Sequence, residues 1–98
     1  MATLLELQGL LNDPALRDRV RAAVVKTALA INFESGSTEN HAARMVLAKA
    51  WLSDPFGHAE KVVRYVVGAN AALTVAEINA LTDAEVQSHV DASASVFI

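Results

Sequence analysis

Signals for the start of an α-helix recur six times along this chain of 98 residues, and no other feature constrains the fold as strongly. Three are Thr-x-x-Glu capping boxes, in which the Thr hydroxyl and the Glu carboxylate each accept a backbone N–H bond. Two are Asp-Pro pairs, since Asp caps free amides and Pro is tolerated in the first turn. The six signals are Thr3 with Glu6, Asp13 with Pro14, Ser37 or Thr38, Asp54 with Pro55, Thr74 with Glu77, and Thr82 with Glu85.

The spacing of these signals predicts an all-α fold, a compact bundle of about five to six short helices in a single helical domain, residues 1–98. Ala supplies about a fifth of the chain and charged residues supply 19%, a composition that suits closely packed helices. Strand signals are weak, because the paired valines in the fourth helix fit a period near 3.6. After a first helix that begins at Thr3, we expect helices at about 14–33, 39–52, 55–71, 75–80 and 83–93.

Apolar residues at helical spacing mark the faces that we expect to be buried. The aromatic residues Trp51, Phe56 and Tyr65 bracket the Asp54–Pro55 corner, where core packing is favoured over a ligand-stacking cluster. The expected stripes are Leu16, Val20, Ala23, Val24, Thr27, Ala28 and Ile31 in the second helix, Ala42, Met45, Val46, Trp51 and Leu52 in the third, and Val62, Val63, Val66 and Val67 in the fourth.

The two Asp-Pro starts belong to similar stretches, LNDPAL at residues 11–16 and LSDPFG at residues 52–57. The first continues into Arg17, Arg19 and Arg21, which raises the question whether it binds a phosphate backbone. The second stretch is followed by fewer cations, so the two share a helix start and an apolar face rather than a basic one. We interpret the repeat as a packing device, and the three arginines as a solvated face that can meet an acidic neighbour or DNA in a channel.

The charge distribution argues against a dedicated DNA-binding domain. All eight Lys and Arg lie between residues 17 and 64, but the formal net charge is -3. A phosphate-binding helix is expected to carry more cations on one face. Residues 74–86, TVAEINALTDAEV, resemble the first half of a helix-turn-helix, yet the turn is short and Asp83 and Glu85 stand where cations are expected. Non-specific DNA contact is kept as an alternative, because a ring of subunits multiplies the few arginines that each chain supplies.

Motifs for catalysis, cofactors or metals are not recognisable in the sequence. His41, His58 and His89 are scattered, without a second ligand at the spacing of a known metal motif. No Gly-x-Ser-x-Gly or glycine-rich phosphate loop surrounds any serine. Cysteine is absent, which excludes disulfides and thiolate metal sites. We therefore expect a protein that is not an enzyme, with no cofactor and no metal.

The two ends of the chain carry different signals. The start, MATLLELQ, has an acid where a signal peptide has cations, and no apolar stretch reaches the roughly 18 residues of a membrane span, so we expect no membrane partner. Residues 93–98, SASVFI, end in the apolar Val96, Phe97 and Ile98. We expect this tail to be an arm, either folded back on its own core or reaching a neighbouring subunit.

Three stretches together resemble a family of small, Ala-rich virion proteins encoded among the head and tail genes of tailed bacteriophages. They are LRDRVRAAVVKTALAI at 16–31, NHAARMVLAKAWLSDP at 40–55 and VVGANAALTVAEINALTDAEVQSHVDA at 66–92. The resemblance implies a non-enzymatic structural protein of the virion, made in the bacterial host cytoplasm, whose partners are its own copies and portal, capsid or tail subunits.

Three functions follow as expectations. The first is a head-tail connector or adaptor ring, because apolar helix faces and an apolar tail favour burial between subunits. The second is a capsid-bound or other tail-layer structural protein. The third, from a different class, is a small helical nucleic-acid-binding or regulatory protein that uses Arg17, Arg19 and Arg21.

Overall fold

The computed structural model describes residues 2–33 and 41–96, and in these two segments it contains helices and no strand. The all-α prediction is confirmed, and the expected helix ranges agree closely with the observed ones. The helices are α1 Leu4–Leu11, α2 Pro14–Asn32, α3 His41–Ser53, α4 Pro55–Ala69, α5 Val75–Asn79 and α6 Asp83–Val96.

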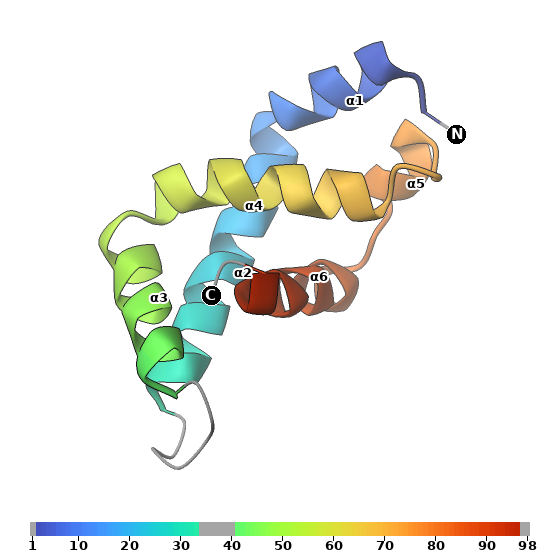
Figure 1. Ribbon diagram of the computed structural model, residues 1–98. Coiled ribbons are helices and arrows are strands. Elements are labelled where there is room, and N and C mark those ends of the chain that lie inside the picture. The colour runs from blue at the N-terminus through green and yellow to red at the C-terminus, as the bar shows by residue number, and fades with distance from the viewer. Residues whose placement is uncertain (1, 34–40, 97–98) are drawn as a thin grey trace.

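Helix α2 is the centre of the packing, since α3, α4 and α6 all lie against it. Helix α4 also contacts α6 and α1, and α1 contacts the short α5. The molecule is elongated, with extents of 43 × 21 × 19 Å. In Figure 1, α1 and α5 occupy one end, and α3 with the last turns of α2 occupies the other. Surfaces at these two ends therefore cannot meet within one chain.

The predicted capping boxes are present at three helix starts. In each, the Thr hydroxyl accepts the amide of the Glu at 3.1–3.2 Å, and the Glu carboxylate accepts the amide of the Thr at 3.0–3.1 Å. These bonds satisfy donors that a helix start leaves without an internal partner. The boxes are Thr3 with Glu6, Thr74 with Glu77, and Thr82 with Glu85. The signal at Ser37 or Thr38 lies outside the described residues.

The two Asp-Pro pairs also start helices, as predicted. Asp13 accepts the amide of Ala15 at 3.0 Å, and Asp54 accepts the amide of Gly57 at 3.0 Å. A Cβ added at Gly57 would lie 2.2 Å from Oδ2 of Asp54. Glycine is therefore needed at position 57 for the Asp54 carboxylate to cap α4.

The predicted stripe of α2 is confirmed in full, because all of its members are buried. The four valines of α4 and Trp51 of α3 are buried as well. Three other expectations are wrong, since Val46 is 70% exposed, Phe56 is 67% exposed and Ala42 is exposed. Helix α3 contacts α2 through its Ala48 and Trp51 side, which leaves Val46 on the outer side, as it does Ala42.

The C-terminal segment differs from the expected arm. Helix α6 continues to Val96, so residues 93–96 are helical rather than extended. Ser93 and Ala94 are buried, and the Ser93 hydroxyl donates to the carbonyl of Val90 at 2.6 Å. Small side chains let this last turn pack against the core, which favours helix over a free arm. Val96 is exposed, and the predicted contacts of Phe97 and Ile98 lie outside the described residues.

Candidate functional site

The three arginines of the predicted partner contact point in different directions from α2. Arg17 donates to the carbonyl of Leu11 at 2.9 Å and pairs with Glu60 at 3.6 Å. Arg21 pairs with Asp18 at 3.6 Å. Each guanidinium thus has contacts within its own chain, and the structure does not gather the three into one cationic face. Their role in binding a partner stays a prediction.

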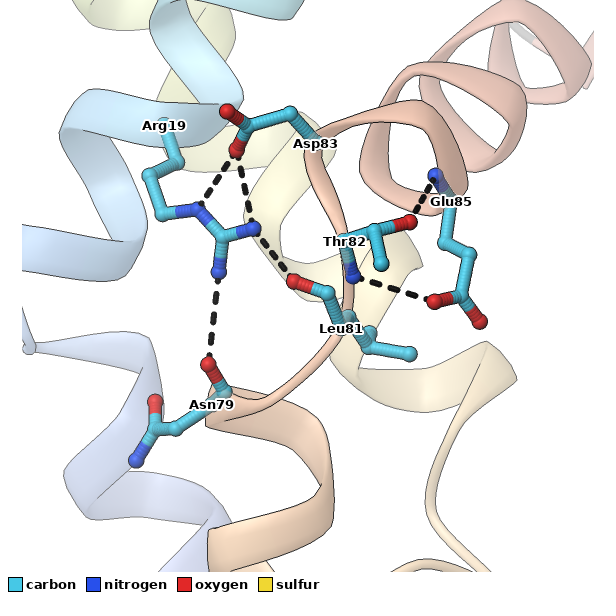
Figure 2. Close-up of polar contacts among 6 residues, drawn as sticks. All are labelled: Arg19, Asn79, Leu81, Thr82, Asp83 and Glu85. Atoms are coloured by element: carbon cyan, nitrogen blue, oxygen red, sulfur yellow. Dashed lines mark hydrogen bonds and ion pairs between the residues drawn. The ribbon is translucent and has the colours of Figure 1, made fainter.

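Arg19 makes several polar contacts with the α5–α6 connection. Its Nε and Nη2 donate to Oδ1 of Asp83 at 3.1 and 3.0 Å. Nη2 also donates to the carbonyl of Leu81, and Nη1 lies 3.5 Å from the carbonyl of Asn79. Figure 2 shows the guanidinium bridging the end of α5 and the start of α6, next to the Thr82 capping box. Arg19 therefore fixes the α5–α6 connection to α2.

The exposed Phe56 ring has a partner at the surface, the guanidinium of Arg21. The Arg21 guanidinium carbon lies 4.3 Å from the centroid of the Phe56 ring, a cation–π geometry. The ring thus covers a cation on α2 instead of entering the core. Together with the pair between Arg17 and Glu60, this contact fixes α4 to the first half of α2.

A polar cluster between α2 and α6 was not predicted as such. The Thr27 hydroxyl donates to Oδ1 of Asp91 at 2.6 Å and accepts from Nε2 of Gln87 at 2.8 Å. The same Gln87 nitrogen donates to the carbonyl of Ala23 at 3.2 Å. Gln87 and Asp91 are four residues apart on α6, a spacing that places them on one face. The only signal in the sequence was a Thr within an apolar stripe.

The histidines do not form a site together. Asn70 donates from Nδ2 to the carbonyl of Val66 at 2.8 Å, and the same atom lies 3.3 Å from Nε2 of His89. His58 lies at the junction of α3 and α4, away from His89. Within residues 2–33 and 41–96, no group of three or more His, Asp or Glu is placed to hold a metal ion.

The hydrogen bonds of the capping boxes favour the ionised form of the three glutamates. The bond from the backbone N–H of Thr3 is the main cause that lowers the pKa of Glu6, and the bond with the Thr3 side chain lowers it further. The same two causes lower the pKa of Glu77 and of Glu85 in their own boxes. Each of these carboxylates therefore remains negative on an exposed surface at neutral pH.

Large apolar side chains are exposed at both ends of the elongated molecule. At the α1 end, Leu4 is 74% and Leu5 is 77% exposed. At the opposite end, Phe33, Leu29 and Val46 are exposed on α2 and α3. Phe33 directly precedes residues 34–40, which lie outside the described part of the chain. Exposed apolar groups at two separate ends are typical of surfaces that meet other molecules.

A groove lies between α3 and α4. It has a volume of about 180 Å³ and is lined by Leu47, Trp51, His58, Lys61 and Val62. Its lining is apolar at the α3 side and carries a cation and an imidazole from α4. The groove can accept an apolar side chain next to a negative group.

The chain matches no family model, no curated protein and no solved structure. Within the described residues, no helix combines the length and the apolar character needed to cross a bilayer. The surface chemistry of this chain is therefore the basis for a functional proposal.

Proposed function

We propose that this chain is a structural subunit that assembles in several copies, and that it is a head-tail connector of a tailed bacteriophage virion. The observation that carries the proposal is the exposure of large apolar side chains at both ends of an elongated helical molecule. The resemblance of residues 16–31, 40–55 and 66–92 to small virion proteins supplies the phage context.

Two different apolar surfaces at opposite ends favour head-to-tail association. Such contacts are heterologous, and they close into a ring when the rotation between subunits allows it. A connector requires a ring, so this arrangement fits a connector better than a symmetric dimer. The capsid-bound or other tail-layer alternative uses the same surfaces but differs in the number of copies per particle.

The proposed partners are further copies of this chain together with portal, capsid or tail subunits. In a ring, exposed cations that face the channel would contact DNA without reading its sequence. Lys26, Lys49 and Arg64 are exposed and suit this contact better than the arginines of α2, which already have partners.

Quantitative mass spectrometry of purified virions tests the proposal. A copy number equal to one ring supports the connector, and a copy number near that of the major capsid protein supports the capsid-bound alternative. Absence of the protein from virions contradicts both.

A regulatory or nucleic-acid-binding role is tested separately by DNA binding at low and high salt. Specific use of Arg17, Arg19 and Arg21 requires binding that weakens steeply with salt and when these residues are neutralised. No mobility shift at low salt excludes that role.

A further inference from the structure

The helices at the two ends of the molecule differ in charge. At one end, α1 and α5 contain no Lys or Arg but the carboxylates Glu6 and Glu77. At the other end, α3 contains Arg44 and Lys49 and no acid. These helices are thus complementary in charge, which favours head-to-tail contact between copies over contact of like ends.

The exposed leucines of α1 match the groove between α3 and α4 in chemistry. Leu4 and Leu5 lie in the first turn of α1, and Glu6 follows them directly with a lowered pKa. The groove has an apolar lining from Leu47, with Lys61 beside it. An apolar side chain next to a carboxylate on one surface is therefore complementary to an apolar hollow next to an ammonium group on the other.

We propose that Leu4 and Leu5 of one copy insert into the α3–α4 groove of the next copy, with Glu6 close to Lys61. The occupant of the groove is a second copy of this chain, and the charge complementarity is the reason for that choice. This inference rests on the proposed function, because it names the surfaces through which the assembled subunits meet. Because the first turn of α1 and the groove are different surfaces of the chain, the contact leaves a free groove and a free α1 on each pair, and the chain of contacts continues.

Disulfide cross-linking tests which surfaces meet. The sequence has no cysteine, so the full-length variants Leu5→Cys and Lys61→Cys each carry one thiol, at an exposed position. Mixed under mild oxidation, they are expected to form a dimer that joins position 5 to position 61. The matched control replaces the second variant by Ser88→Cys, exposed on α6. A yield for the 5–61 pair no higher than the control, or a dominant 5–5 dimer, overturns the inference.

Sedimentation of uncross-linked protein at low salt gives a second, independent measurement. Lys61→Glu is expected to weaken self-association several-fold, whereas Lys26→Glu, the same charge change outside the groove, leaves it unchanged. Leu5→Ala is expected to weaken it by roughly tenfold if the leucine is a central contact. Equal effects of the two lysine variants contradict the inference.

The inference and the proposed function fail in different ways. If virions contain a ring of this protein but position 5 does not cross-link to position 61, the subunit role stands and the named surfaces are wrong. If the cross-link forms but virions lack the protein, the surfaces are right and the connector role is wrong.

Discussion

Replacing Arg19 with methionine removes the guanidinium that connects α2 to the α5–α6 connection and keeps the apolar stem of the side chain. Arg19 donates to the carbonyls of Leu81 and Asn79 and to the carboxylate of Asp83. The Asp83 side chain is 91% exposed, so its ion pair is screened by water and contributes only a few tenths of a kcal/mol.

The carbonyl bonds account for most of the expected effect. A charged donor bonded to a partly buried carbonyl contributes roughly 1.5 kcal/mol, and the longer bond to Asn79 contributes less. We therefore expect Arg19→Met to lower the free energy of unfolding by about 2 kcal/mol. In a domain of this size, that corresponds to a fall of roughly 10 °C in Tm.

Urea and thermal unfolding followed by far-ultraviolet circular dichroism measure this change. Asp83→Asn is the matched control, because it removes the charge of the partner but leaves both carbonyl bonds, and we expect it to lower stability by about 0.5 kcal/mol or less. If Asp83→Asn is as destabilising as Arg19→Met, or if Arg19→Met leaves stability unchanged, the carbonyl bonds do not have the assigned role.

Three further predictions concern local contacts. Gly57→Ala should be less stable than Gly68→Ala by about 1 kcal/mol, because both variants gain helix propensity but only the methyl group at position 57 displaces the Asp54 cap; urea unfolding of the two variants checks this. Thr27→Val should lower stability by about 1–2 kcal/mol, measured by the same unfolding, because it removes both hydroxyl bonds between α2 and α6, one of them to Asp91. The capping-box glutamates have lowered pKa values in the folded state, so their contribution is complete above the ordinary glutamate pKa and is lost as pH falls through the lowered value. Stability measured at falling acid pH should therefore decline less in a variant with Gln at the three positions.

Local features of the sequence predicted the helix starts, since a capping box or an Asp-Pro pair acts through bonds that span two or three residues. The period of apolar residues likewise predicted which face of α2 is buried. Contacts between distant parts of the chain were not predictable in this way. Arg19 looked like one of three similar cations, and only the fold brings Asp83, 64 positions away, to it.

The wrong expectations have the same origin. Val46 follows the apolar period of α3, but its exposure depends on which side of α3 meets α2. Phe56 was expected in the core, yet an arginine on another helix provides a partner at the surface. Residues 93–98 were expected to be an arm because the chain ends in three apolar residues after small ones, while the packing of Ser93 and Ala94 keeps residues 93–96 helical.

An electron-microscopy reconstruction of the phage particle that carries this protein tests the central claim most directly. The connector role predicts a single ring of these helical subunits at the junction of head and tail, and the proposed contact places α1 of each subunit against the α3–α4 groove of the next. Subunits distributed over the capsid surface, or a junction built entirely of other proteins, would contradict it.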